Sequence, residues 1–493
     1  MKKYILFLLL GGFITVSCSK DDETITGGNG PNPDPSANVA TQDFMWKAMN
    51  LWYFWQADVA NLADDRFSSN AEYTTFLQSE ADPADFFDNQ LRFGEDRFST
   101  YSSDYEDFTN FLSGITKSNG LSFGLINYSG DLLVGYIRYV TPNSDAASKD
   151  ILRGEFFTGV DGTTLTINNY IDLLFGENDT YALNMADMIS ATEYTTNGKE
   201  VSLTKQEGFQ ENPIFISESF DINGQKIGYL YYNRFLNEFD EALNNAIIQL
   251  KSQGITDLVL DLRYNPGGSV NSTRLLASMI YGTNTNDLFI RQRWNPKIQA
   301  AFSASDVEDY FADRTGSGTT INSLNLNRVY ILTTSRSASA SELLINGLDP
   351  YMQVIQVGTT TTGKNEFSLT MVDDPARDGA PYIYTPSRET FINSENRWAL
   401  QPLVGRNENS VGFSDYTSGF IPEIELAEDL ANLGILGDLN EPLLARAIED
   451  ITGMSGKRDF SVQIPANPFT DTDMFTPMKD NMVLDKPLKI NLK

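Results

Sequence analysis

A serine and a lysine in the C-terminal half of the chain have the types and setting of a nucleophile and its base. Ser339 lies between an apolar run and a helical run, and Lys364 follows the next apolar run. This order predicts a strand, a tight turn, a helix, a second strand and a loop. The segments are, in turn, 329–334, 337–342, 343–348, 354–357 and 363–364. Parallel strands joined in this way lie side by side, so groups beyond their carboxyl ends can meet. We therefore expect Ser339 and Lys364 to form a nucleophile and base pair.

The composition restricts the mechanisms that a hydrolase built from this chain could use. The sequence has no histidine and one cysteine, Cys18. Ser-His-Asp catalysis, Cys-His catalysis and Cys/His zinc sites are therefore excluded. The base has to come from Lys, Asp, Glu or Tyr, and lysine is a known partner of catalytic serines. This chemistry needs no metal and no organic cofactor.

The first residues have the pattern of an export signal. A basic start precedes the apolar segment 4–16, which is too short to span a bilayer as a helix. The small residue before Cys18 resembles a bacterial lipobox, in which the cysteine is acylated; an ordinary signal with an incidental cysteine is the alternative. We expect a lipoprotein signal peptide over 1–18 and a Gly- and Pro-rich flexible linker over 19–41. The anchor would hold the exported protein on the outer membrane, at the periplasmic face or the cell surface.

The size and charge of the chain indicate the number of domains and the kind of partner. The residues after the linker, about 450, are enough for two to four domains. The formal net charge of −30 disfavours binding to nucleic acid or to an anionic membrane surface. We expect protein or peptide partners, and the acidic groups also fit an ordinary solvated surface.

A helical subdomain is predicted over 42–105. Segment 44–55 holds three of the five tryptophans and has apolar residues on more than one helical face, which is typical of a mostly buried helix. Further helices are predicted over 72–77 and 83–91. A sugar-stacking platform of tryptophans is the alternative to a small helical core.

Segment 106–208 changes to β character, with short strands, a small helix and a Gly-turned hairpin. This order resembles a PDZ domain of processing proteases. Phe123, Gly124 and Leu125 match its carboxylate-binding loop, and 152–162 match its most regular stretch. Such domains hold a peptide's terminal carboxylate on backbone N–H groups while the peptide adds a strand to the sheet. An inert β spacer is the alternative.

A βαβ unit is predicted before the serine. Its strand, helix and strand are 227–232, 238–250 and 258–262. The second strand ends in a Pro-Gly-Gly turn, and a helix over 269–281 follows. Glycines at such a turn let a substrate backbone approach closely and direct N–H groups outward. Gly267 and Gly268 could therefore supply half of an oxyanion hole.

Three blocks together, 260–268, 337–342 and 363–364, resemble the signature of the C-terminal processing (tail-specific) protease family. In that family the middle serine of the second block is the nucleophile, and the lysine follows 25 positions later, the spacing of Ser339 and Lys364 here. The resemblance covers roughly 95–451 and implies an α/β, crotonase-like protease core, which we expect over 209–455. It also implies a serine endopeptidase that uses a Ser-Lys dyad. The acidic run 19–23 after Cys18 resembles the export signal of Bacteroidetes lipoproteins, so we expect a lipoprotein member of that type.

The serine block leaves alternatives open. Ser339 and Glu342 also fit a capping box, in which the serine only accepts an N–H at the helix start. Ser337 or Ser341 could be the nucleophile, although spacing and family position favour Ser339. The N–H of Ala340 is the natural second oxyanion donor, by analogy with other nucleophile turns.

A lysine base has to be neutral. The pKa of Lys364 must fall from about 10.4 toward 7 or 8, at a cost of roughly 3 to 5 kcal/mol, and burial must supply that shift. Pairing with Glu366 would prevent it, so we expect Glu366 to point elsewhere. Many family members carry a glutamine four positions after the lysine as a third, orienting group; Ser368 stands there in this sequence.

The remaining sequence gives weaker signals. Short strands are expected over 382–384 and 460–464, and a helix over 438–451. The C-terminal extension, 456–493, is either an added edge strand or a tail. Three functions follow: an exported serine endopeptidase, a catalytically inactive surface lipoprotein that binds peptides through the PDZ-like module, or a glycan-binding lipoprotein.

Overall fold

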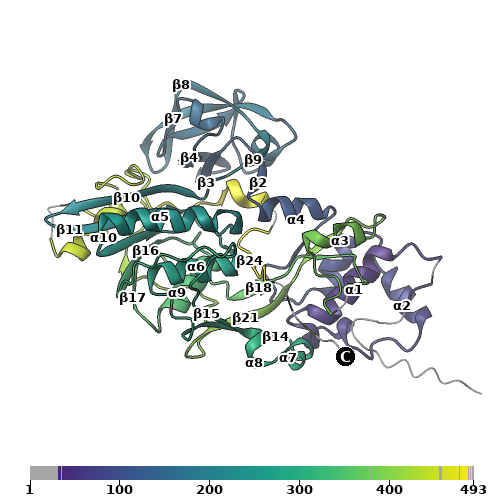
Figure 1. Ribbon diagram of the computed structural model, residues 1–493. Coiled ribbons are helices and arrows are strands. Elements are labelled where there is room, and N and C mark those ends of the chain that lie inside the picture. Colours follow the sequence, from purple (N-terminus) through teal and green to yellow (C-terminus); the bar gives the residue numbers. More distant parts are fainter. Residues whose placement is uncertain are drawn as a thin grey trace, which may run out of the picture.

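The computed structural model describes residues 32–34, 36–377, 379–454, 458–476, 478–486, 488 and 490. Cys18, the predicted signal peptide and most of the predicted linker lie outside the described residues. Figure 1 shows a β-rich module at the top, an α/β core below it and a helical N-terminal region on the right. The domain boundaries drawn from the sequence stay predictions.

The N-terminal region is helical, as expected. It contains α1 (Ala40–Trp52), α2 (Asn70–Leu77) and α3 (Pro83–Phe86), which leads into a π-helical turn, Phe87–Leu91. Trp46 and Trp52 are buried, and their ring N–H groups donate to the backbone carbonyls of Asn61 and Pro381. These two rings belong to a core, and buried rings offer no platform for a sugar.

A six-stranded sheet forms the centre of the core. Its strands, in spatial order, are β10 (Ile214–Ile222), β11 (Gln225–Tyr232), β12 (Asp257–Asp261), β16 (Arg328–Thr333), β17 (Gln353–Gly358) and β22 (Ile424–Glu425). β10 is antiparallel to β11, and all other pairs are parallel. Leu260 of β12 lies opposite Ile331 of β16. The turns that follow these two strands therefore leave the sheet next to each other.

Helices cover both faces of this sheet. They are α5 (Asp240–Gln253), α6 (Val270–Ile280) and α9 (Ala340–Leu348) on one face and α10 (Pro442–Thr452) on the other. Successive side chains of a strand point to opposite faces of the sheet, so Leu260 packs with the three helices and its neighbour Val259 packs with α10. α5 ends at Gly254, which has the left-handed φ of 73° that favours glycine.

A second six-stranded sheet lies next to the central one. Its order is β13 (Gly268–Ser269), β24 (Met482–Val483), β18 (Glu366–Ser368), β21 (Leu403–Asn409), β14 (Leu288–Trp294) and β15 (Glu308–Tyr310). β24, from the C-terminal extension, lies between β13 and β18 and is parallel to both. The extension is thus an internal strand at this place.

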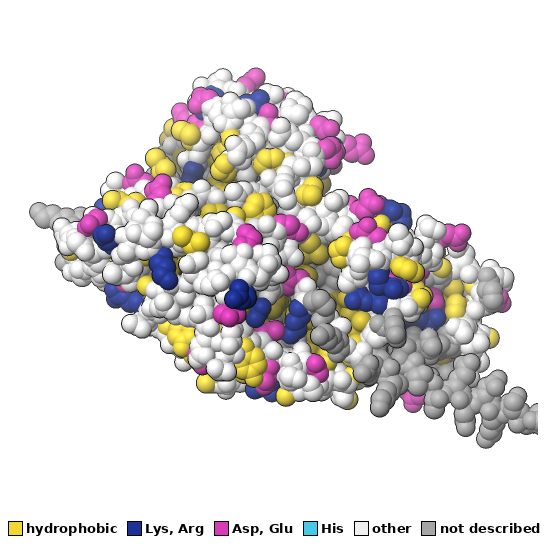
Figure 2. Space-filling model, viewed as in Figure 1, with side chains coloured by type: hydrophobic (Ala, Val, Ile, Leu, Met, Phe, Trp, Pro, Cys, Tyr) yellow, Lys and Arg dark blue, Asp and Glu magenta, His cyan; other side chains and the backbone are white. Residues whose placement is uncertain are grey.

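Smaller elements complete the core. They are β1 (Thr100–Ser102), β20 (Ala399–Gln401) and β19 (Met371–Val372), which form a three-stranded sheet, and the helices α4 (Tyr105–Leu112), α7 (Pro296–Ala301) and α8 (Ala304–Val307). Within the described part of the chain, no helix combines the length and the hydropathy needed to cross a bilayer. On the face drawn in Figure 2, acidic side chains are spread over the module, the core and the N-terminal region.

The β-rich module has its own sheet and hydrophobic core. Its main strands are β3 (Leu121–Ser129), β4 (Leu132–Val140), β5 (Phe156–Val160), β7 (Thr180–Ser190) and β8 (Glu193–Thr204), joined by the short strands β2 (Ile115–Ser118), β6 (Thr163–Thr164) and β9 (Gln206–Gln210). The predicted loop at Phe123, Gly124 and Leu125 is wrong, since these residues lie within β3. They pair with β4 on one side and with β23 (Thr470–Asp471), from the extension, on the other.

Two predicted strands are also wrong. Over 382–384 the chain makes only an isolated bridge at Ile383, because Tyr382 has a φ of 70°, which is incompatible with an extended strand. Over 460–464 no strand forms, because Gln463 and Ile464 donate their N–H groups to the Asp429 carboxylate instead of to a neighbouring strand. The predicted helix over 438–451 begins at Pro442.

Candidate active site

Ser339 lies at the turn between β16 and α9, at the cap position of the helix. Its backbone is in an unusual conformation for a residue with a side chain, with φ 60° and ψ −109°. The residue is fully buried, and its Oγ has no hydrogen-bond partner among the described residues. The hydroxyls of Ser337 and Ser341 instead donate to the carbonyls of Leu262 and Asn265. Of the three serines, only Ser339 has its hydroxyl unused.

Lys364 is buried on the loop after β17. Its Nζ donates to Asn481 Oδ1 over 2.6 Å and lies 4.8 Å from the centre of the Phe98 ring. Burial lowers the pKa of Lys364 to about 7, although Asp480 and Glu366 act in the opposite direction. Glu366 points away, as expected, and forms an ion pair with Arg406 at 3.0 Å. Lys364 therefore has the low pKa that a general base needs at neutral pH.

Glu342 connects the serine and the lysine. Its Oε2 accepts the backbone N–H of Ser339 at 2.8 Å and that of Lys364 at 2.9 Å. Its Oε1 accepts the N–H of Gly363 and the hydroxyl of Thr361, both at 2.6 Å. Burial raises the pKa of Glu342, and these four hydrogen bonds oppose the rise. The sequence signal was the capping-box pattern, which we considered only as an alternative role for Ser339.

The glycine turn lies directly against Ser339. Gly267 has a φ of 113°, and a Cβ added there would come within 2.7 Å of the Ser339 Cβ and 3.0 Å of the Ala340 N. The Gly267 N–H donates to Asn265 Oδ1, whereas the Gly268 N–H donates to the carbonyl of Asn481, each over 2.9 Å. The N–H of Ala340 belongs to the first turn of α9, where no intrahelical acceptor exists. Gly267 and Ala340 therefore lie together beside Ser339, and Gly268 is the glycine whose N–H points to a group outside its own turn.

Asn265 holds the glycine turn to the serine block. Its carbonyl accepts the N–H of Ala338 at 3.1 Å and the hydroxyl of Ser341 at 3.0 Å, and its side chain donates to the carbonyl of Tyr232 at 2.9 Å. Arg263, also fully buried, pairs with Asp261 and Glu441 at 2.7 and 2.6 Å. These contacts fix the turn after β12 against the start of α9.

Ser368 contacts the lysine only through another residue. Its hydroxyl lies 3.3 Å from Asn481 Oδ1, the atom that accepts from Lys364 Nζ, and it accepts from Gln401 Nε2 at 2.9 Å. The amide that meets the lysine therefore comes from the C-terminal extension. Nothing in the sequence pattern around Asn481 indicated this role.

Two segments of the chain match family models that contain these features. Residues 40–100 match the peptidase S41 N-terminal domain, and residues 226–380 match peptidase family S41. These two segments are identified as peptidase family S41 domains. The second match contains the glycine turn, Ser339, Glu342 and Lys364, and the first covers the helical N-terminal region.

Curated relatives match part of this chain. A CtpA-like serine protease of Staphylococcus aureus is 28% identical over 193 residues, which are 38% of this chain and 35% of the relative. A CtpA-like serine protease of Staphylococcus saprophyticus is 29% identical over 308 residues, 53% of this chain and 59% of the relative. The matches thus span less than two thirds of either relative. They support the C-terminal processing type within this family of serine peptidases.

A solved structure from Bacteroides fragilis, described as an S41 protease, resembles most of the fold. It superposes with a TM-score of 0.64 at 24% sequence identity, over 84% of this chain and 97% of that one. This similarity supports the mixed α/β S41 fold with a helical N-terminal region.

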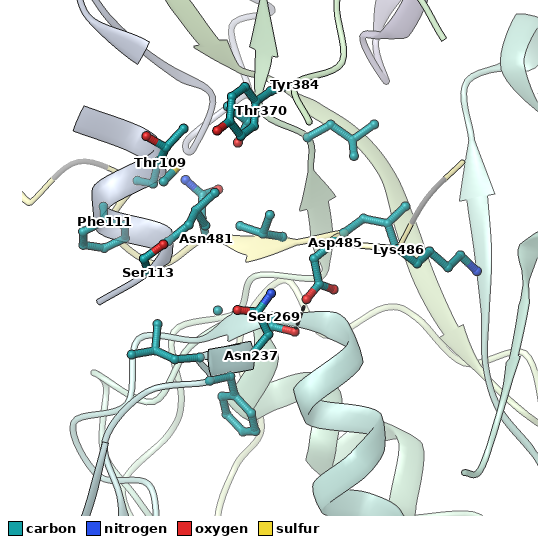
Figure 3. A pocket seen from close by; sticks show the side chains of 18 of the residues that line it. Thr109, Phe111, Ser113, Asn237, Ser269, Thr370, Tyr384, Asn481, Asp485 and Lys486 are labelled. Carbon is teal, nitrogen blue, oxygen red and sulfur yellow. Dashed lines mark hydrogen bonds between the residues drawn. The ribbon is translucent and has the colours of Figure 1, made fainter. Parts of the chain in front are cut away.

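A cavity of about 560 Å³ lies beside the glycine turn. Figure 3 shows that Asn481, Asp485 and Lys486, from the extension, cross the middle of the view, with Thr370 and Tyr384 on one side and Asn237 and Ser269 on the other. Gly267 and Gly268 line this cavity, whereas Ser339 and Lys364 do not. Ser339 and Lys364 thus lie outside the lining of the cavity, and Asn481 contacts both the glycine turn and the lysine.

Proposed function

We propose that this protein is a serine endopeptidase that cleaves proteins or peptides with Ser339 as nucleophile and Lys364 as base. One observation carries the proposal: the backbone N–H groups of Ser339 and Lys364 both donate to Glu342 Oε2, and Lys364 is buried with a pKa of about 7. A lysine in this state accepts a proton at neutral pH, as a nucleophilic serine requires.

The reaction is acyl transfer in two halves. Neutral Lys364 takes the Ser339 proton while Oγ attacks the carbonyl carbon of the scissile peptide bond. The protonated lysine then gives its proton to the departing amine, and the acyl group stays on the serine as an ester. Lys364, neutral again, removes a proton from water, which attacks the ester. The protonated lysine then returns this proton to Ser339 Oγ as the bond to the serine breaks and the new carboxyl terminus is released.

The oxyanion of each tetrahedral intermediate would rest on the N–H groups of Gly268 and Ala340. Ala340 directly follows Ser339, Gly268 directly follows the Gly267 that lies against Ser339, and neither N–H is needed by a neighbour within its own turn or helix. The role that we gave Gly267 changes in detail: its N–H holds the turn through Asn265, and its lack of a side chain makes room for Ser339.

The test is covalent labelling by a fluorophosphonate probe together with cleavage of casein, an unstructured protein. We expect Ser339→Ala to abolish both and Lys364→Ala to reduce both by several orders of magnitude. Ser252→Ala and Lys251→Ala, at exposed neighbouring positions, are matched controls that should retain activity. Labelling that persists in Ser339→Ala at the wild-type rate would contradict the proposal.

We also propose that the protein is exported and lipid-anchored through Cys18, with a crotonase-like core and a PDZ-like module that receives substrate termini. The basic and apolar start followed by the lone cysteine supports the anchor. A fatty-acid label should enter the wild-type protein but not Cys18→Ser, which should also leave the membrane fraction.

A second candidate function is peptide binding without catalysis. The pairing of β23 with β3 favours it, because a sheet edge that takes up an added strand can bind an extended peptide in the same way. Peptide binding by a wild-type protein that fails to label at Ser339 under any condition would support this second function over the first.

A further inference from the structure

We propose that the C-terminal segment 469–485, described apart from residue 477, occupies the substrate path of this protein and keeps the candidate site closed until it is displaced. The inference rests on the proposed function and adds its regulation. In Figure 1 the extension, in yellow, runs along the boundary between the module and the core and continues to β24.

The first part of the segment is bound by the module as an added strand. Thr470 and Asp471 pair antiparallel with Leu125 and Gly124, and Phe469 donates its N–H to the Leu125 carbonyl at 2.7 Å. The Thr472 hydroxyl accepts the Phe123 N–H at 2.6 Å. These are the three module residues that the sequence assigned to peptide binding, and the segment uses their backbone groups.

Aromatic and charged contacts strengthen this end. Phe469 packs edge-on against Tyr170, and Phe475 against Phe175. Asp471 is buried between Arg336 of the core, at 2.8 Å, and Arg138 of the module, at 3.5 Å. Burial alone would raise the pKa of Asp471, but these arginines hold it below its usual value. The segment therefore lies where the module and the serine loop meet.

The second part of the segment reaches the catalytic groups. The carbonyl of Asn481 accepts the Gly268 N–H, and its side-chain oxygen accepts from Lys364 Nζ. One residue thus takes up a proposed oxyanion donor and the proposed base together. Ser339 Oγ meanwhile has no hydrogen-bond partner among the described residues, so the lysine is directed to Asn481 and not to the nucleophile.

β24 then fills the remaining sheet edges. Met482 and Val483 pair with Gly268 and Ser269, and Leu484 donates its N–H to the Ser368 carbonyl at 3.1 Å. A substrate that extends along the glycine turn needs the same edge of β13. Because Ser339 and Lys364 are fully buried with the segment in place, an extended peptide can reach them only after this strand has moved.

Two features of the segment favour its dissociation from the core. Met478 and Asp480, just before Asn481, have left-handed φ values of 54° and 58°, a conformation that costs energy for residues with side chains. The cavity of about 560 Å³ lies beside the segment and is lined by Gly268, Asn481 and Asp485. Release would free the Gly268 N–H, open the turn toward this cavity and leave Lys364 free to turn to Ser339.

The experiment cuts the connection to the segment in the full-length protein. A recognition sequence for a site-specific protease is inserted after the exposed Asn467, and the rate of fluorophosphonate labelling is measured before cutting and after cutting with dilution to micromolar concentration. A tethered segment has an effective concentration on the order of millimolar, so we expect the rate to rise about tenfold or more after its release. A synthetic peptide of residues 468–486 should return the rate to that of the uncut protein.

Two outcomes would overturn the inference. The first leaves the proposed function in place, and the second removes it as well. Equal labelling of Ser339 before and after release contradicts the regulatory role alone. Absence of labelling in both forms, compared with Ser339→Ala, contradicts the proposed function and the inference together.

A point variant keeps the test decisive if the cut protein loses its fold. Asn481→Ala removes the acceptor of Lys364 Nζ, so we expect faster labelling of the uncut protein, by up to about tenfold, the factor that one hydrogen bond supports. The exposed Asn467→Ala is the matched control and should leave the rate unchanged. An unchanged or lower rate in Asn481→Ala would mean that Asn481 orients the working lysine, and would overturn the inference.

Discussion

Ser339 and Lys364 donate their backbone N–H groups to the same oxygen atom, Glu342 Oε2, at 2.8 and 2.9 Å. The shared acceptor fixes the distance between the serine turn and the lysine loop through their backbones, whatever rotamers the Ser339 and Lys364 side chains adopt. Because the carboxylate belongs to the first turn of α9, any shift of this helix moves the serine and the lysine loop together.

Glu342→Gln tests this connection. An amide has one acceptor oxygen and would turn its NH₂ group either toward the N–H groups of Ser339 and Lys364 or toward the Gly363 N–H and the Thr361 hydroxyl, leaving buried donors without partners. We expect the free energy of unfolding to fall by about 2 to 4 kcal/mol, with labelling of Ser339 lost. Urea unfolding and probe labelling measure the two effects. A variant with wild-type stability and labelling would show that the connection is dispensable.

The pH dependence of labelling tests the role of Lys364. Only the neutral amine can accept a proton, so the rate should increase about tenfold per pH unit below pH 7 and level off above it. Glu366→Gln removes a charge that raises the pKa of Lys364, so its midpoint should lie at lower pH. Asp221→Asn, at an exposed site on β10, is the control. A midpoint that moves upward would contradict this assignment.

Gly267→Ala tests the close approach of the turn to the serine. The new methyl group would lie within contact distance of the Ser339 Cβ, at a φ of 113°. We expect a loss of stability on the order of 1–3 kcal/mol from backbone strain, with labelling abolished. Gly316→Ala, where an added Cβ meets nothing within 4 Å, should behave as wild type. Thermal unfolding and labelling distinguish the two variants.

Glu428 should contribute to resistance against acid. Burial would raise its pKa, but Arg153 and Arg263 lower the pKa of Glu428 to about 2, below its ordinary 4.5. A carboxyl with a lower pKa in the folded state stabilises fully above pH 4.5, and this stability is lost as the pH falls toward 2. Glu428→Gln should therefore be less stable at pH 7, by about 3 kcal/mol, and the difference should shrink below pH 4.5. A difference that is constant with pH would refute the assignment.

Local patterns predicted the core well because its elements carry local signals. The apolar run 329–334 became β16 one residue earlier, and the helix predicted over 238–250 became α5, which ends before Gly254 as expected. The backbone N–H groups of Ser339 and Lys364 meet at Glu342, which agrees with the geometry expected of parallel strands; their pairing as nucleophile and base stays a prediction. Each of these inferences needed only periodicity, a breaker residue or a known connection.

The failures have a different cause. β24 has two residues and pairs with partners far away in the sequence, so neither its existence nor the role of Asn481 had a periodic signal. At Gln463 and Ile464 a distant carboxylate, Asp429, replaced the strand partner that the alternation indicated. Such choices depend on tertiary contacts that a single sequence does not display.

The strand pairing between β23 and β3 has a consequence for how a visiting polypeptide could gain entry. Thr472 and Asn481 are nine positions apart, a connection that can reach at most about 30 Å when extended. A polypeptide that first replaces β23 on β3 therefore releases the attachment to the module, while Asn481 and β24 still cover Ser339. Under the proposed regulation, entry would be a stepwise strand exchange that begins at β3, and the affinity of a protein for β3 would then select which proteins are cut.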